Sequence, residues 1–144
     1  MPSYKSVLTV DDDRSALAIY RAYFLGLGVE RYLEAHSGVR AIELLKEQTD
    51  PVDLIQIDIY MPEMDGIELL RMLSEMNYAG SVVIASGARP IDRSSALNLA
   101  STYQLDIIGE ITKPLSRARL DAVYQPHQQY SFLEAPFQPA PAAS

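Results

Sequence analysis

Carboxylates at the ends of two apolar segments are the residues of this sequence best suited to chemistry. Asp58 ends the run Leu54–Asp58, just before a loop that contains proline and glycine, and the triplet Asp11–Asp13 follows the apolar run Val7–Val10. A strand that leads into such a loop places its last residue at the carboxyl edge of a sheet, where open α/β folds bind ligands. If the two strands are neighbours, the carboxylates meet and repel one another unless a cation binds or protons are taken up. Carboxylate oxygens suit Mg²⁺, which usually shares its shell with a phosphate.

Short apolar runs alternate with helical patterns along the chain. The predicted strands are Ser6–Val10, Arg31–Glu34, Leu54–Asp58, Ser81–Ser86 and Ile107–Ile111. The predicted helices are Arg14–Leu27, Ser37–Gln48, Gly66–Met76, Pro90–Tyr103 and Ser116–Tyr124. Asp13 and Ser37 are expected to cap the first two helices, and Gly28 is expected to stop the first. Strands that alternate with helices predict an α/β fold, with a parallel sheet covered on both faces.

The composition favours one globular domain over residues 4–124, followed by a tail or linker over residues 125–144 that is rich in Pro, Ala and Gln. A net charge of −7 argues against a nucleic-acid-binding surface, and the lack of cysteine excludes disulfides and thiolate catalysis. No apolar run approaches the ~20 residues that span a bilayer. The amino terminus also lacks the basic and apolar regions of a signal peptide. We therefore expect a cytoplasmic protein that does not bind membranes.

Several further residues stand in a recognisable order with these aspartates. The set is Asp11, Asp12, Asp58, Met61-Pro62, Asp65-Gly66, Ser86 and Lys113-Pro114. In order and spacing over residues 4–124 it resembles the receiver domain of a two-component response regulator. The resemblance implies a flavodoxin-like (βα)5 fold, a doubly wound parallel sheet with strand order 2-1-3-4-5. In that order the carboxyl ends of the first and third strands flank the point where ligands bind.

The resemblance also implies roles for the acidic residues. Asp58 would be the nucleophile that accepts a phosphoryl group from the phosphohistidine of a histidine kinase or a histidine phosphotransfer protein. Asp11, Asp12 and Asp58, with the backbone carbonyl of Tyr60, would hold Mg²⁺ or Mn²⁺. In the family the second aspartate of the pair usually binds the metal directly and the first binds it through water. Taken alone, an aspartate at a strand end also fits a turn cap, and the companion residues decide against that interpretation.

Two further residues would sense the phosphoryl group. Lys113 would contact the acceptor carboxylate and then a phosphoryl oxygen, and the hydroxyl of Ser86 would hydrogen-bond the phosphoryl group and move inward. The bond before Pro114 is typically cis in the family. Where receivers commonly carry an aromatic residue, three positions before the lysine, this chain has Glu110. The surface that meets the output partner must therefore change on phosphorylation by other means than the movement of an aromatic ring.

The predicted function is a phosphorylation-controlled switch that assists its own phosphorylation and dephosphorylation and is not an enzyme for a separate metabolite. The interval between Ser86 and Lys113 is longer than in most receivers, and the Gly109-Glu110 pair lies near its end. In this the chain resembles receivers that precede EAL-type cyclic-di-GMP phosphodiesterase domains. The resemblance implies an output domain or protein as a partner, reached through the fourth helix, fifth strand and fifth helix. It also implies a homodimer through the fourth-helix face as a habit of the family.

Three alternatives remain open at this point. A degenerate receiver would act only as a docking scaffold, a role that Glu110 keeps open. A Mg²⁺-dependent phosphohydrolase of the haloacid-dehalogenase type would need a second aspartate two residues after Asp58, where Tyr60 stands. A nucleotide- or flavin-binding module would need a glycine-rich loop after the first strand, where Asp11–Asp13 stand instead and would repel a phosphate.

Overall fold

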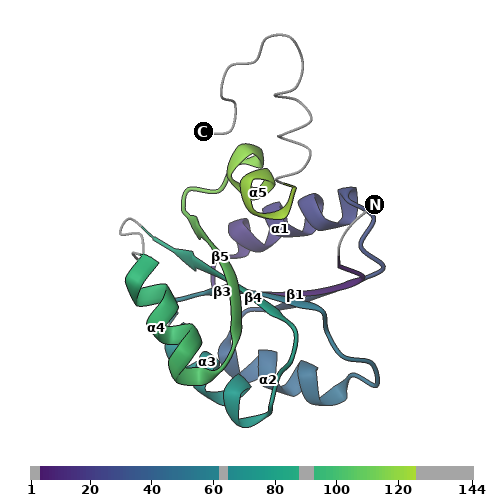
Figure 1. Cartoon of the computed structure of the whole chain (residues 1–144). Helices are drawn as coiled ribbons and strands as arrows, with labels where there is room; N and C mark the ends of the chain where they lie inside the picture. The colour runs from purple at the N-terminus through teal and green to yellow at the C-terminus, as the bar shows by residue number, and fades with distance from the viewer. Residues whose placement is uncertain (1–3, 62–64, 88–92, 126–144) are drawn as a thin grey trace.

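The computed structural model describes residues 4–61, 65–87 and 93–125, in which strands and helices alternate (Figure 1). The strands are β1 Ser6–Val10, β2 Arg31–Ala35, β3 Leu54–Asp58, β4 Ser81–Ser86 and β5 Asp106–Thr112. The helices are α1 Arg14–Gly26, α2 Gly38–Glu47, α3 Gly66–Glu75, α4 Arg93–Tyr103 and α5 Arg117–Tyr124. The predicted alternation of strands and helices is confirmed.

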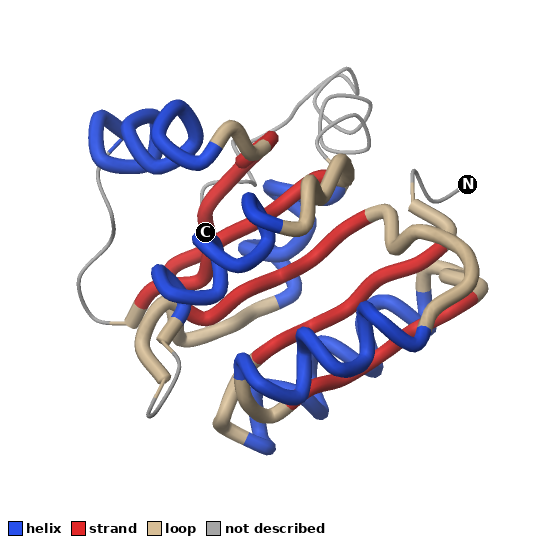
Figure 2. The backbone as a smooth tube through the Cα atoms, turned by 90° about the horizontal axis from the view of Figure 1, so that it is seen from below, coloured by secondary structure: helices blue, strands red, loops and turns tan. Residues whose placement is uncertain are grey.

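The five strands form one parallel sheet in the order β2-β1-β3-β4-β5. Helices α1 and α5 cover one face, and α2, α3 and α4 cover the other (Figure 1). Figure 2 shows the strands side by side between the helices. The predicted flavodoxin-like, doubly wound architecture is therefore confirmed. In this order β1 and β3 are direct neighbours, so the residues that follow them meet at one edge of the sheet.

Strands β1 and β3, both in the interior of the sheet, are buried along their whole length, as expected for a parallel sheet between helices. Their side chains alternate between the two halves of the core. In β3, Leu54 packs with residues of α1 and α5, whereas Ile55 and Ile57 pack with residues of α2 and α3. Gln56 and Asp58 follow Leu54 at intervals of two, so they belong to the face that α1 and α5 cover.

The predicted capping residues stand at the starts of the first two helices. Asp13 caps α1 by accepting a hydrogen bond from the N–H of Ser15 at 2.9 Å, and Ser37 caps α2 by accepting from the N–H of Arg40 at 3.1 Å. Gly28 adopts a φ of 88°, a conformation that lets the chain leave the helix without the strain of a side chain.

Several element ends differ from the predictions by one residue, where backbone hydrogen bonds decide them. The strand predicted as Ile107–Ile111 is longer by one residue at each end, because β4 pairs with β5 from Asp106 to Thr112. The helix predicted to end at Leu27 ends at Gly26, with Leu27 as its cap. The predicted start of the fourth helix at Pro90 and residues 126–144 of the predicted tail lie outside the described residues. Within the described ranges, no helix is long and apolar enough to cross a bilayer.

Candidate functional site

Three carboxylates gather at the carboxyl edge of the sheet. Asp11 directly follows β1 and Asp58 ends β3, and one oxygen from each of Asp11, Asp12 and Asp58 lies within 4.8 Å of the others. Asp11 is fully buried, Asp58 is 4% exposed and Asp12 is exposed. Two carboxylates thus form a buried floor, and the third lies at the solvent side, which is the convergence that the strand order predicts.

Lys113 provides a positive charge to this group. It follows β5, and its Nζ lies 2.7 Å from Asp11 Oδ2 and 3.3 Å from Asp58 Oδ2. The backbone holds it there, because its N–H donates to the carbonyl of Ser86 at 2.9 Å. The peptide bond between Lys113 and Pro114 is cis, as the resemblance predicts. One ammonium group therefore contacts two buried carboxylates, one that directly follows β1 and one that ends β3.

Burial and like charge change the protonation of Asp58. Burial, followed by the negative charge of Asp11, raises the pKa of Asp58 to about 6, although the N–H of Tyr60 and the ammonium of Lys113 both act to lower it. Burial acts to lower the pKa of Lys113, but Asp11 and Asp58 outweigh that effect and the pKa is raised. A single lysine therefore leaves a surplus of negative charge, and a divalent cation would relieve it. The donor set, three carboxylates within reach of one ion, is the chemistry that Mg²⁺ or Mn²⁺ takes.

Tyr60 takes part in the site through its backbone. Its N–H donates to Asp58 Oδ1 at 3.1 Å, and the residue as a whole is 61% exposed. The predicted role of its carbonyl as a metal ligand stays a prediction. The loop then returns to the sheet, since the N–H of Gly66 donates to the carbonyl of Ile59 at 2.9 Å.

Ser86 has a partner that the sequence analysis missed. It ends β4 and is fully buried, and its hydroxyl donates to Glu110 Oε2 on β5 at 2.9 Å. A β-bulge between Val82 and Val83 shifts the strand register so that Ile84, and not Ala85, pairs with Glu110. The acid at the position of the usual aromatic residue is therefore joined to the serine that the resemblance assigns to phosphoryl sensing.

A polar layer below the carboxylates was also missed. The hydroxyl of Tyr124 on α5 donates to Gln56 Oε1, and Gln56 Nε2 donates to the carbonyl of Val83 at 3.4 Å. Tyr20 on α1 is fully buried, and burial, with the charges of Asp11 and Asp58, raises its pKa, so its hydroxyl stays neutral. Glutamine in an apolar strand was the only signal of this layer in the sequence, and it does not identify its partner.

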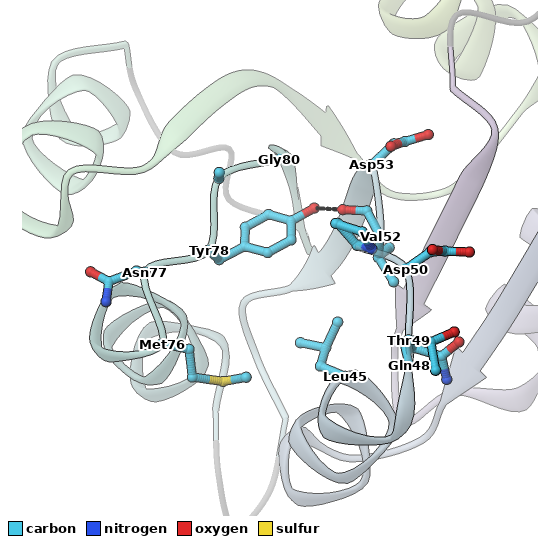
Figure 3. A pocket seen from close by; sticks show the side chains of 12 residues that line it. Leu45, Gln48, Thr49, Asp50, Val52, Asp53, Met76, Asn77, Tyr78 and Gly80 are labelled. Carbon is cyan, nitrogen blue, oxygen red and sulfur yellow. Dashed lines mark hydrogen bonds between the residues drawn. The ribbon is translucent and has the colours of Figure 1, made fainter.

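A hollow of about 500 Å³ lies at the opposite, amino-terminal edge of the sheet (Figure 3). It lies between the segment that joins α2 to β3 and the segment that joins α3 to β4, with Leu45, Val52, Met76 and Tyr78 in its wall. The hydroxyl of Tyr78 donates to the carbonyl of Val52 at 2.7 Å. This hollow is remote from Asp58, which ends its strand at the other edge.

The family of the chain follows from comparison with known proteins. The model of the response regulator receiver domain matches residues 7–125, and the chain therefore belongs to this family, whose members are parts of two-component signalling systems. A solved response regulator from Colwellia psychrerythraea superimposes with a TM-score of 0.67 at 29% identity, covering 83% of this chain and 93% of the other.

Curated relatives are longer proteins. The chain is 33% identical over 138 residues to the transcriptional regulatory protein ZraR of Klebsiella oxytoca. The aligned segment covers 95% of this chain and 29% of ZraR. The chain is 33% identical over 91 residues to the cyclic di-GMP phosphodiesterase RocR of Pseudomonas aeruginosa, which covers 63% of this chain and 23% of the relative. The chain thus spans less than a third of the length of either relative.

Proposed function

We propose that this chain is a phospho-accepting receiver in which Asp58 takes a phosphoryl group from a histidine kinase or a histidine phosphotransfer protein. The observation that carries the proposal is the position of Asp58 among Asp11, Asp12 and Lys113, with Lys113 Nζ 3.3 Å from its carboxylate. Carboxylates grouped in this way, with one lysine, suit the transfer of an anionic group to a carboxylate nucleophile.

In the transfer, a carboxylate oxygen of Asp58 attacks the phosphorus of phosphohistidine. An O–P bond forms, the P–N bond breaks, and the imidazole leaves with the electron pair and takes up a proton. Asp11, Asp12 and Asp58, with the Tyr60 carbonyl, would hold Mg²⁺ or Mn²⁺, which when bound neutralises negative charge on the phosphoryl oxygens. The N–H of Tyr60 and the ammonium of Lys113 orient the Asp58 carboxylate before attack.

Lys113 and Ser86 act after the transfer. The ammonium of Lys113 already lies between the two buried carboxylates, and a phosphoryl oxygen on Asp58 would give it a new partner nearby. Ala85 of β4 pairs with Asp58 across the sheet. Ser86 is the next residue of β4, so it lies beside the end of the strand that carries the acceptor. We infer that these two side chains convert phosphorylation into a change at the β4–β5 side of the domain.

The proposed task of the chain is regulatory. The receiver would comprise residues 4–124 and residues 125–144 would connect it to an output domain or present it to an output protein. The similarity to RocR supports a cyclic-di-GMP phosphodiesterase as one such output. The domain would work in the cytoplasm, form a homodimer through the α4 face, and turn over no separate metabolite.

The test is intact mass after incubation with Mg²⁺ and acetyl phosphate. We expect wild type to gain the mass of one phosphoryl group only when Mg²⁺ is present, and Asp58→Ala to gain none. Asp106→Ala, which removes an exposed acid at the opposite end of β5, is the matched control and should be labelled like wild type. If wild type gains no mass and forms no complex with beryllofluoride, the docking scaffold replaces this proposal.

A further inference from the structure

The hydroxyl of Ser86 has one proton, and it donates this proton in a hydrogen bond to Glu110. Ser86 Oγ donates to Glu110 Oε2 at 2.9 Å, in a place where Ser86 is fully buried and Glu110 is half-buried. A hydroxyl donates a single hydrogen bond, and an ionised carboxylate only accepts. Hydrogen bonds to a charged acceptor are also the stronger kind. The direction in which this hydroxyl points is therefore set by Glu110.

This contact depends on how β4 and β5 pair. After the β-bulge, Ile84 pairs with Glu110 and Ser86 pairs with Thr112, so Ser86 and Glu110 lie diagonally on the same face of the sheet. Without the bulge, Glu110 would pair with Ala85 and point to the other face, away from Ser86. The bulge thus brings an acid on the edge strand β5 to a serine at the end of β4, beside the strand that carries Asp58.

A phosphoryl group on Asp58 would compete for the same proton. Its oxygens are anionic acceptors, as the oxygens of Glu110 are, so Ser86 cannot donate to both at once. We propose that Glu110 is a positioning residue that holds Ser86 in the unphosphorylated arrangement and opposes its turn toward the phosphoryl group. This inference rests on the proposed function. The charge at position 110 then sets how readily the domain switches, and the hydrogen bond between Ser86 and Glu110 on β5 breaks when the domain switches.

The experiment measures the affinity of the whole chain for beryllofluoride with Mg²⁺, followed by fluorine NMR because the chain has no tryptophan. Glu110→Ala removes the competing acceptor, and we expect it to bind beryllofluoride about tenfold more tightly than wild type. Glu110→Gln keeps an acceptor oxygen without the charge and should fall between the two. Urea unfolding of each variant establishes that it is folded at the titration temperature.

A double-mutant cycle separates this role from a general effect of charge. Removing any acid near an anionic ligand strengthens binding somewhat, but only the proposed contact depends on the serine hydroxyl. We therefore expect the gain from Glu110→Ala to disappear in the Ser86→Ala background. Asp106→Ala is the matched control, because Asp106 accepts from Ser81 Oγ at 3.5 Å at the other end of the same two strands. It should leave the affinity within about twofold of wild type, since an exposed, distant charge is screened.

The outcomes separate the role of Glu110 from the phospho-acceptor function. If Glu110→Ala raises beryllofluoride affinity when Ser86 is present, and does not raise it in the Ser86→Ala variant, the role of Glu110 is supported. No gain, or an equal gain in both backgrounds, overturns that role and leaves the phospho-acceptor function standing. If wild type itself binds no beryllofluoride, the role of Glu110 fails, and if it also gains no phosphoryl mass, the phospho-acceptor function fails with it.

Discussion

The two edges of the sheet use acidic residues in opposite ways. At the carboxyl edge, Asp11 and Asp58 are buried together and share one lysine, and the pKa of Asp58 is raised to about 6. At the amino edge, Asp53 accepts hydrogen bonds from the backbone N–H groups of Lys5 at 2.8 Å and Ser6 at 3.2 Å. One edge brings carboxylates close to one another, and the other places a carboxylate on backbone donors.

The amino edge is a closed set of structural contacts. The hydroxyl of Ser6 donates to the carbonyl of Pro51 at 3.3 Å and accepts from the N–H of Asp53 at 2.9 Å. Asp53 in turn joins the start of β1 to the start of β3, and its carbonyl accepts from the N–H of Ser81 at 2.9 Å. These contacts stabilise three strands, and the Asp53 carboxylate among them accepts from neutral backbone donors and faces no second acid in these contacts. The difference teaches that an acid stabilises the fold where it meets donors and prepares a site for cations where it meets other acids.

The largest effect on stability is expected where the site loop contacts the end of β3. A Cβ on Gly66 would lie 2.5 Å from Ile59 Cα and 2.6 Å from the carbonyl oxygen of Asp58. Because both are backbone atoms, Gly66→Ala must displace the loop, and we expect it to lower the free energy of unfolding by about 3 kcal/mol. Urea denaturation measures this, with Gly26→Ala as control, since a Cβ there meets nothing within 4 Å. Equal stability of the two variants would contradict this packing.

The next effect concerns the amino edge. Asp53→Ala removes the acceptor of two backbone N–H groups, and we expect the free energy of unfolding to fall by about 2 kcal/mol. Beryllofluoride affinity should stay that of wild type, because the change is at the other edge. Asp50→Ala is the matched control in the same loop, since Asp50 uses its backbone carbonyl to accept from Arg31. A loss of ligand affinity without a loss of stability would reverse the comparison between the edges.

At the carboxyl edge, removing the charge of an acid should raise the free energy of unfolding, the opposite of the effect expected for Asp53→Ala. The pKa of Asp58 is raised to about 6 from an ordinary value of 3.8, so the folded state binds the proton more tightly than the unfolded state. The stability from this group is then complete below about pH 4 and is lost as the pH rises through about 6. In metal-free buffer at pH 7.5, Asp58→Asn should be more stable than wild type by about 1–2 kcal/mol, allowing for partial screening.

The pH dependence is the check on this prediction. Unfolding of wild type and Asp58→Asn in urea, with a chelator, is followed between pH 4 and pH 8. The two free energies should approach each other toward the acidic end, because protonated Asp58 is neutral like asparagine. A constant difference across this range would show that packing, and not the charge of Asp58, causes the gain.

The smallest effect is expected for the exposed pair at the start of β4 and β5. Ser81 Oγ lies 3.5 Å from Asp106 Oδ2, at the edge of hydrogen-bond distance and in solvent. Asp106→Ala should change the free energy of unfolding by less than about 0.5 kcal/mol. The same measurement on Ser81→Ala tests the pair from its other side. A larger loss would mean that this pair is as structural as the contacts of Asp53.

The sequence by itself determined the alternation of strands and helices and the acidic group at the sheet edge. Period-two and period-3.6 apolar patterns are local, and so are caps such as Asp13 and Ser37, because each contact joins residues a few positions apart. Asp58 could be singled out because a carboxylate at the end of an apolar strand stands out against its neighbours. The order of the strands came from the resemblance to receivers and is confirmed by the pairing of β1 with β3.

Only the tertiary structure decided which distant polar groups meet. The contact of Ser86 with Glu110 depends on a bulge that changes the register by one residue, and a register change of one turns a side chain to the other face of the sheet. The bond between Tyr124 and Gln56 joins residues 68 positions apart, through a helix whose angle on the sheet is set by packing. Local patterns predict elements because their energies are local, whereas partners across strands follow from register and packing, which the whole chain sets.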